Sequence, residues 1–276
     1  AVIALLYTAV SIAGGWEDAS REIAENTGMT VSQAARLKTE AVKVATTLDH
    51  QLATSEDILA VQSEIANEFG IQGMMSAEVA ADTADIGKAF GYGASEAAKV
   101  SSEFMNMGMT AAEARDMQRE LAAESLKAGV NVGGVMKDIQ QNAKKVSKYF
   151  GGNVKQLKKA AIQAAKMGVS LSTMAKVADG LLDFESSLTA QFELQALTGR
   201  QMNFDKARQL ALEGKIAEAT EEVLDQVGSI SDFNSMGYLE RKKLAEASGM
   251  EVDELQKSLT IRDKLGSLTD EELAAY

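Results

Sequence analysis

The chain of 276 residues contains no proline, the residue that most strongly opposes helix formation. An average chain of this length would carry roughly 14 prolines, at about 5%. The sequence is instead rich in Ala, Leu, Met, Glu, Gln and Lys, which favour helices, while aromatic residues make up only 5%. We therefore predict an all-α fold without β-sheet. The 46% of apolar residues is enough to bury a core.

A recurring joint divides the chain into short segments. It consists of a glycine, an apolar residue and then a residue that can cap a helix. The copies are Gly28-Met29-Thr30, Gly108-Met109-Thr110, Gly168-Val169-Ser170 and Gly249-Met250-Glu251, with Gly91-Tyr92-Gly93-Ala94-Ser95 as a looser copy. A left-handed glycine ends one helix, the apolar residue folds back on it, and the capping residue starts the next helix. This pattern predicts a string of about fourteen short helices and helical hairpins.

Capping boxes support these joints. Thr30 with Gln33, Thr110 with Glu113 and Thr269 with Glu272 each have the required spacing. A helix-turn-helix that reads DNA would need a basic second helix, whereas the helices expected after these joints are mixed or acidic. We interpret the joints as connectors between packed helices and predict no specific nucleic-acid site.

Charge is distributed unevenly along the chain. The net charge is −12, yet residues 137–176 contain nine lysines and a single acid, Asp138. A subset of these lysines has an 11-residue repeat that would place them on one face of a continuous helix. These residues are Lys144, Lys148, Lys155, Lys159 and Lys166. The face is either simply solvated, or contacts an acidic partner, which includes the acidic helices of the chain itself, or binds DNA or an anionic membrane.

These features suggest three regions. They are an N-terminal helical region (1–130), lysine-rich amphipathic helices (131–179) and a C-terminal helical region (180–276). Residues 1–16 carry no charge and have no preceding methionine, so the chain looks like the middle of a longer polypeptide. This opening segment is either a buried helix or the end of a membrane-active segment that begins upstream, because sixteen residues fall short of a bilayer span of roughly 20.

Signatures of catalysis are sparse. Without cysteine, and with His50 as the sole histidine, the chain is not expected to hold a His/Cys metal site, and no cofactor is predicted. The pair Asp49-His50 has no recognisable nucleophile around it. Gly91-Tyr92-Gly93 lacks the third glycine of a dinucleotide loop. Glu185, followed by two serines, is the one place where a peptidoglycan hydrolase could be considered. We predict no catalytic residue.

The part of the chain from Gly180 to about Leu259 resembles the tail tape measure proteins of tailed bacteriophages. The segments that carry the resemblance are Leu181-Leu182-Asp183-Phe184-Glu185-Ser186-Ser187, Leu197-Thr198-Gly199-Arg200-Gln201-Met202-Asn203, Lys206-Ala207-Arg208, Gln226-Val227-Gly228-Ser229, Asp232-Phe233-Asn234 and Leu244-Ala245-Glu246-Ala247-Ser248-Gly249-Met250. They cover about 80 of the 276 residues and are patterns of helix and turn.

The resemblance implies a non-enzymatic virion protein in the lumen or at the tip of the tail tube. Such a protein sets the tail length during assembly and leaves ahead of the DNA at infection. The partners that it implies are other copies of the chain, tail tube proteins, baseplate or tail-tip proteins, and the host membrane. Two alternatives stay open at this point: a membrane-active helical protein that inserts in the host envelope to aid DNA passage, and a peptidoglycan hydrolase.

Overall fold

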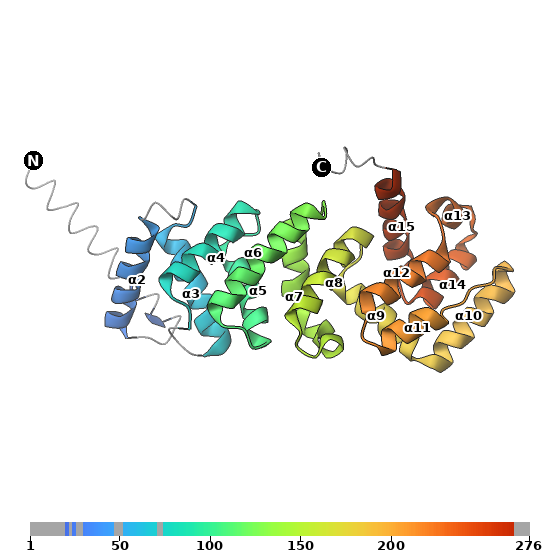
Figure 1. The fold of residues 1–276 in the computed structure, drawn as a ribbon, viewed down its shortest axis with the longest axis horizontal. Coiled ribbons are helices and arrows are strands. Elements are labelled where there is room, and N and C mark those ends of the chain that lie inside the picture. The colour runs from blue at the N-terminus through green and yellow to red at the C-terminus, as the bar shows by residue number, and fades with distance from the viewer. Residues whose placement is uncertain (1–19, 22–23, 26–29, 47–51, 71–73, 268–276) are drawn as a thin grey trace, which may run out of the picture. The chain divides into compact units, whose positions relative to one another are not determined.

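The computed structural model describes residues 20–21, 24–25, 30–46, 52–70 and 74–267. These residues form fourteen α-helices and no strand, which confirms the predicted all-α fold for the described part of the chain (Figure 1). Four of the expected features lie wholly or partly outside the described residues: the uncharged opening segment 1–16, the joint Gly28-Met29-Thr30, the pair Asp49-His50 and the capping box of Thr269 with Glu272.

The chain divides into two compact units, 1–120 and 121–276. The first contains α2 (Val31–Ala45), α3 (Ser55–Phe69), α4 (Ala77–Ala89) and α5 (Ala94–Asn106), and the boundary lies within α6 (Ala111–Lys127). The regions 131–179 and 180–276, which the sequence analysis separates, belong to the same unit.

Small side chains dominate the core of the first unit. In α4, Ala80, Ala81 and Ala84 are fully buried, and they share the core with Ala97 and Ala98 of α5. Helix α5 packs against both α3 and α4. Because alanine adds little bulk to a helix, such faces allow neighbouring helices to approach closely. The larger buried side chains Ile58, Val61, Ile65, Val100 and Phe104 fill the remaining space.

The second unit is built around α9. Its helices are α7 (Val132–Phe150), α8 (Val154–Met167), α9 (Leu171–Leu182), α10 (Phe184–Thr198), α11 (Asp205–Leu212), α12 (Ile216–Val227), α13 (Ile230–Ser235), α14 (Tyr238–Ser248) and α15 (Val252–Ser267). Helix α9 packs against α7, α8, α10, α11, α12 and α14. Its apolar residues Leu171, Met174, Val177, Ala178 and Leu181 are all buried, which explains this central position.

The glycine joints at Gly108, Gly168 and Gly249 have the predicted structure. At Gly168 the amide N–H bonds to the carbonyl of Ala165, while the next amide, that of Val169, reaches back to Ala164. The same pair of bonds closes the joints at Gly108 and Gly249, and all three glycines have positive φ. This arrangement is the Schellman motif. Thr110 then caps α6 in a capping box with Glu113, as predicted.

Candidate functional site

The five lysines singled out in the sequence lie on two helices. Lys144 and Lys148 belong to α7, whereas Lys155, Lys159 and Lys166 belong to α8. Gly151, in the left-handed conformation at φ 53°, ends α7, and the side chain of Asn153 caps α8. The idea of one continuous lysine face was therefore wrong, because it required a single helix through Gly151 and Gly152. The 11-residue repeat crosses a turn that resets the helical phase.

Several lysines of this region contact acids of the chain itself. Lys148 forms an ion pair with Asp179 of α9 at 2.8 Å, and Tyr149 donates a hydrogen bond to the same carboxylate. Burial, together with this bond, raises the pKa of the Tyr149 hydroxyl to about 12. Lys158, which is buried, pairs with Glu124 at 2.6 Å. By contrast, Lys155, Lys159 and Lys166 lie exposed along α8. The ion pairs of Lys148 and Lys158 help to hold α7 and α8 within the second unit.

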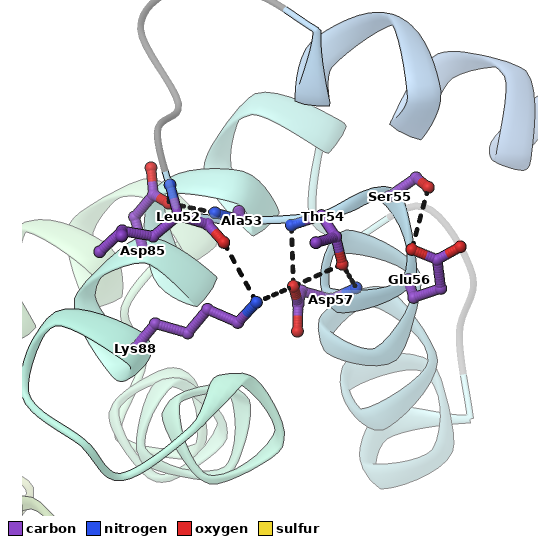
Figure 2. Close-up of polar contacts among 8 residues, drawn as sticks. All are labelled: Leu52, Ala53, Thr54, Ser55, Glu56, Asp57, Asp85 and Lys88. Atoms are coloured by element: carbon purple, nitrogen blue, oxygen red, sulfur yellow. Dashed lines mark hydrogen bonds and ion pairs between the residues drawn. The ribbon is translucent and has the colours of Figure 1, made fainter.

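A polar cluster surrounds the start of α3 in the first unit (Figure 2). Asp57 and Thr54 form a capping box, in which the amide N–H of Thr54 donates to the Asp57 carboxylate at 2.8 Å. From α4, Lys88 forms an ion pair with Asp57 and donates to the carbonyl of Leu52 at 3.1 Å. Asp85 accepts hydrogen bonds from the amides of Leu52 and Ala53, the latter at 2.6 Å. The last turns of α4 thus hold the segment that leads into α3.

Three charged side chains of this cluster bond to each other or to the backbone: Lys88 pairs with Asp57, and Asp85 accepts from two backbone amides. Burial raises the pKa of the Asp57 carboxyl, but the hydrogen bonds from Lys88 and Thr54 outweigh burial, and the pKa lies below its usual value. The arrangement acts as a clamp between α3 and α4.

This clamp should make the first unit sensitive to acid. A carboxyl whose pKa is lowered by folding contributes stability above its unfolded pKa of about 3.9, and that stability is lost as pH falls through the folded pKa. We expect Asp57→Asn to cost about 1 kcal/mol at pH 7 and to flatten the loss of stability below pH 4. Urea unfolding at a series of pH values measures both effects. Glu78→Gln, an exposed position of α4, is the control, and an equal flattening there would contradict the assignment.

The second unit has a cavity of about 510 Å³ beside the start of α9, between α7, α8 and α15. Its polar lining is largely satisfied internally. Asp138 accepts hydrogen bonds from the Leu171 amide at 2.8 Å and from the Asn142 side chain at 2.7 Å. Thr173 donates to Glu254 at 2.9 Å. Burial raises the pKa of the Asp138 carboxyl despite these bonds. The volume suits a small ligand. The Asp138 carboxylate, however, is already bonded to the first backbone amide of α9.

Glu185 lies on the surface of α10, and the glycines near residue 92 lie in a turn between two helices. Glu185 lies exposed in the first turn of α10, outside the lining of the neighbouring pocket that contains Asp183 and Ser187. This placement does not favour a hydrolase built on that carboxylate. Gly91 and Gly93 have positive φ and form the turn between α4 and α5, as expected of a joint.

A cluster of buried polar side chains, which was not predicted from the sequence, lies between α10 and α11. Arg208 of α11 is only 4% exposed. Its guanidinium donates to the Ser187 hydroxyl at 2.9 Å, to the Gln191 side chain at 2.8 Å and to Asp205 at 2.8 Å. The amides of Gln191 and Gln195 in turn both donate to the carbonyl of Met202. A largely buried hydrogen-bonded network therefore joins α10 to α11 and to the segment between them.

Comparison with known proteins finds no matching family, no similar characterised protein and no similar solved structure. Among the helices of the described residues, none is long and apolar enough to cross a membrane. The described part of the chain also has no group of three or more His, Cys, Asp or Glu side chains placed to hold a metal ion.

Proposed function

We propose that the chain is an internal segment of a tail tape measure protein of a tailed bacteriophage, with a structural rather than enzymatic role. The observation that carries the proposal is the order of residues from Gly180 to about Leu259, in which the family-like segments coincide with helix boundaries. Gly199 ends α10, Asn203 accepts a hydrogen bond from the first amide of α11, and Gly249 ends α14. The resemblance implies a long, helix-rich chain, and the helices of this region agree with that helical character.

The packing also suits a chain that travels through a narrow tube. Many core positions are alanines, and most helices end at a glycine or a short turn, so the burial per helix is modest. Elements with few large buried side chains open at lower free energy than a densely packed core. Such helices could be drawn out one after another during ejection.

An in-frame deletion of α7 and α8 in the phage that encodes the chain tests the proposal. We expect mass spectrometry of purified tails to detect peptides of this chain, with or without the deletion. The deletion removes 36 residues (132–167), so tails measured by electron microscopy should shorten by up to about 54 Å, at ~1.5 Å per helical residue. The exposed substitution Glu185→Gln in the same phage should leave tail length unchanged.

The two measurements separate the parts of the proposal. Absence of the chain from purified tails would overturn it as a whole. Presence of the chain with an unchanged tail length would overturn the ruler role of this segment.

A further inference from the structure

The cavity beside the start of α9 is lined by charged side chains of both signs from two separate helices. Helix α7 contributes Lys137 and Asp138, and α15 contributes Glu254 and Lys257. These four side chains form no ion pair with one another, and neither lysine bonds to another of the described residues. Each of the two helices therefore presents one cation and one anion to the space between them.

The packing of α15 holds this cavity open. A Cβ on Gly168 would lie 2.3 Å from the Ile261 side chain, so α15 already rests directly on the joint between α8 and α9. The Ser258 hydroxyl donates to the carbonyl of Met167 at 2.6 Å and fixes the same contact. Helix α15 consequently cannot settle further into the space, and a ligand would find a preformed site. Small residues of α7 and α8 leave the volume free: Gly134, Ala161 and Ala165.

The two acids lie on the same side of the cavity, at the start of α9. Asp138 accepts from the Leu171 amide at 2.8 Å, and Glu254 accepts from the Thr173 hydroxyl at 2.9 Å. Each carboxylate accepts one further hydrogen bond, while a carboxylate has about four acceptor sites. Burial raises the pKa of the Asp138 carboxyl, so an ammonium group beside it would be favourable. The acids can thus accept a cationic group without releasing α9.

The two lysines supply the anion-binding groups. Lys137 and Lys257 are exposed, so their ammonium groups can turn toward a ligand in the cavity. A purely anionic ligand would be repelled by the two carboxylates, and a purely cationic one by the two ammonium groups. A molecule that carries both charges is attracted by both pairs. Apolar side chains complete the lining and suit an apolar body: Val135, Val169 and Ile261.

We propose that this cavity binds a small zwitterion with an apolar body, of the class of a short peptide with free termini. The ammonium end contacts Asp138 and Glu254, and the carboxylate end contacts Lys137 and Lys257. The volume of about 510 Å³ lies within the range of small-molecule sites, about 300–1,000 Å³. Binding is weak, in the millimolar range, because ion pairs with exposed lysines contribute little. This inference does not depend on the proposed function.

Titration of the full chain with the dipeptide leucyl-leucine, followed by isothermal titration calorimetry, tests the choice of ligand. The dipeptide with both termini free should bind saturably. Acetylation of its amino end or amidation of its carboxyl end should each weaken binding about three- to fivefold, and blocking of both ends about tenfold or more. These factors correspond to the loss of one or two solvent-screened ion pairs.

Variants of the lining test the place of binding. Lys137→Gln and Lys257→Gln should each weaken binding of the free dipeptide about threefold. The matched control is Lys155→Gln, an exposed lysine of α8 outside the lining, which should bind as the natural chain does. Ala165→Leu should abolish binding because the larger side chain fills the cavity, and circular dichroism checks that this variant is folded. The lysine variants alter exposed, unpaired side chains and stay informative if Ala165→Leu does not fold.

Three outcomes would overturn the proposal. The first is the absence of saturable binding of leucyl-leucine at millimolar concentrations. The second is equal binding of the doubly blocked peptide, which would mean an apolar cavity that does not select charge. The third is an equal loss of affinity in Lys155→Gln and Lys257→Gln, which would mean general electrostatic attraction in place of a contact within this cavity.

Discussion

Replacement of Gly87 by alanine should destabilise the first unit by about 3 kcal/mol. In the interior of an ordinary helix the same change is stabilising, by roughly 0.5–1 kcal/mol, because alanine loses less backbone entropy on folding. The sign reverses here because a Cβ on Gly87 would lie 2.1 Å from the carbonyl oxygen of Gly93 and 2.9 Å from the Cβ of Ala97. The atom that it would meet first is backbone and cannot move aside without shifting α5.

The hydrogen bonds around Gly87 also explain why the loss of stability should extend to the turn between α4 and α5. Its carbonyl accepts hydrogen bonds from the amides of Tyr92 and Gly93, both at 3.0 Å, and these bonds close the turn between α4 and α5. The Gly93 carbonyl accepts the amide of Ala97 in the first turn of α5. A side chain at residue 87 therefore separates the two helices where both the turn and the packing depend on close approach.

Gly180→Ala provides the matched control for this prediction. Gly180 also lies inside a helix, α9, but a Cβ there would meet only the Cα of Gly249, at an ordinary 3.8 Å. We expect this variant to be more stable than the natural chain by about 0.5–1 kcal/mol. Urea unfolding gives both free energies, and hydrogen exchange should localise the loss in Gly87→Ala to α4 and α5. A Gly87→Ala chain as stable as the natural one would contradict the close approach.

The features that the sequence predicted correctly are those that depend on near neighbours. The absence of proline predicted an all-helical chain, and the joints at Gly108, Gly168 and Gly249 are closed by hydrogen bonds between residues three and five positions apart. The buried residues Ile216, Val223 and Val227 of α12 recur at helical spacing, which is likewise a local pattern. In such cases the local pattern and the tertiary fold demand the same conformation.

The features that the sequence did not predict depend on distant residues. A glycine pair such as Gly151-Gly152 is compatible with either a helix or a turn, so the phase of the lysines across it was undetermined. The clamp at α3 joins Leu52 and Ala53 to Asp85, more than thirty residues away. Phe184, Leu188 and Phe192 follow each other at helical spacing, but such spacing does not reveal which way a stripe of side chains faces. In α10 that direction is set by Arg208, 21 residues beyond Ser187.

Replacement of Arg208 by leucine should therefore be among the most damaging single changes in the second unit. The variant keeps most of the apolar volume of the side chain but removes every donor to Ser187 and Gln191. Each buried acceptor left unsatisfied costs about 1–3 kcal/mol, so we expect a loss of about 3 kcal/mol in the free energy of unfolding. The bond to Asp205 contributes little to this figure, because that carboxylate is 77% exposed.

Two further variants distinguish the loss of the network from a loss of packing. Arg208→Lys retains the charge, but an ammonium cannot reproduce the planar fork that reaches both partners, so an intermediate loss of about 1–2 kcal/mol is expected. The triple variant Ser187→Ala, Gln191→Leu, Arg208→Leu removes the buried acceptors together with the donor. It should recover most of the stability, since apolar replacements of a complete buried polar network are often neutral.

Urea unfolding of the three variants, with hydrogen exchange in α10 and α11, measures these effects. If Arg208→Leu were as stable as the natural chain, or if the triple variant were less stable than the single one, the network would not hold α10 in place.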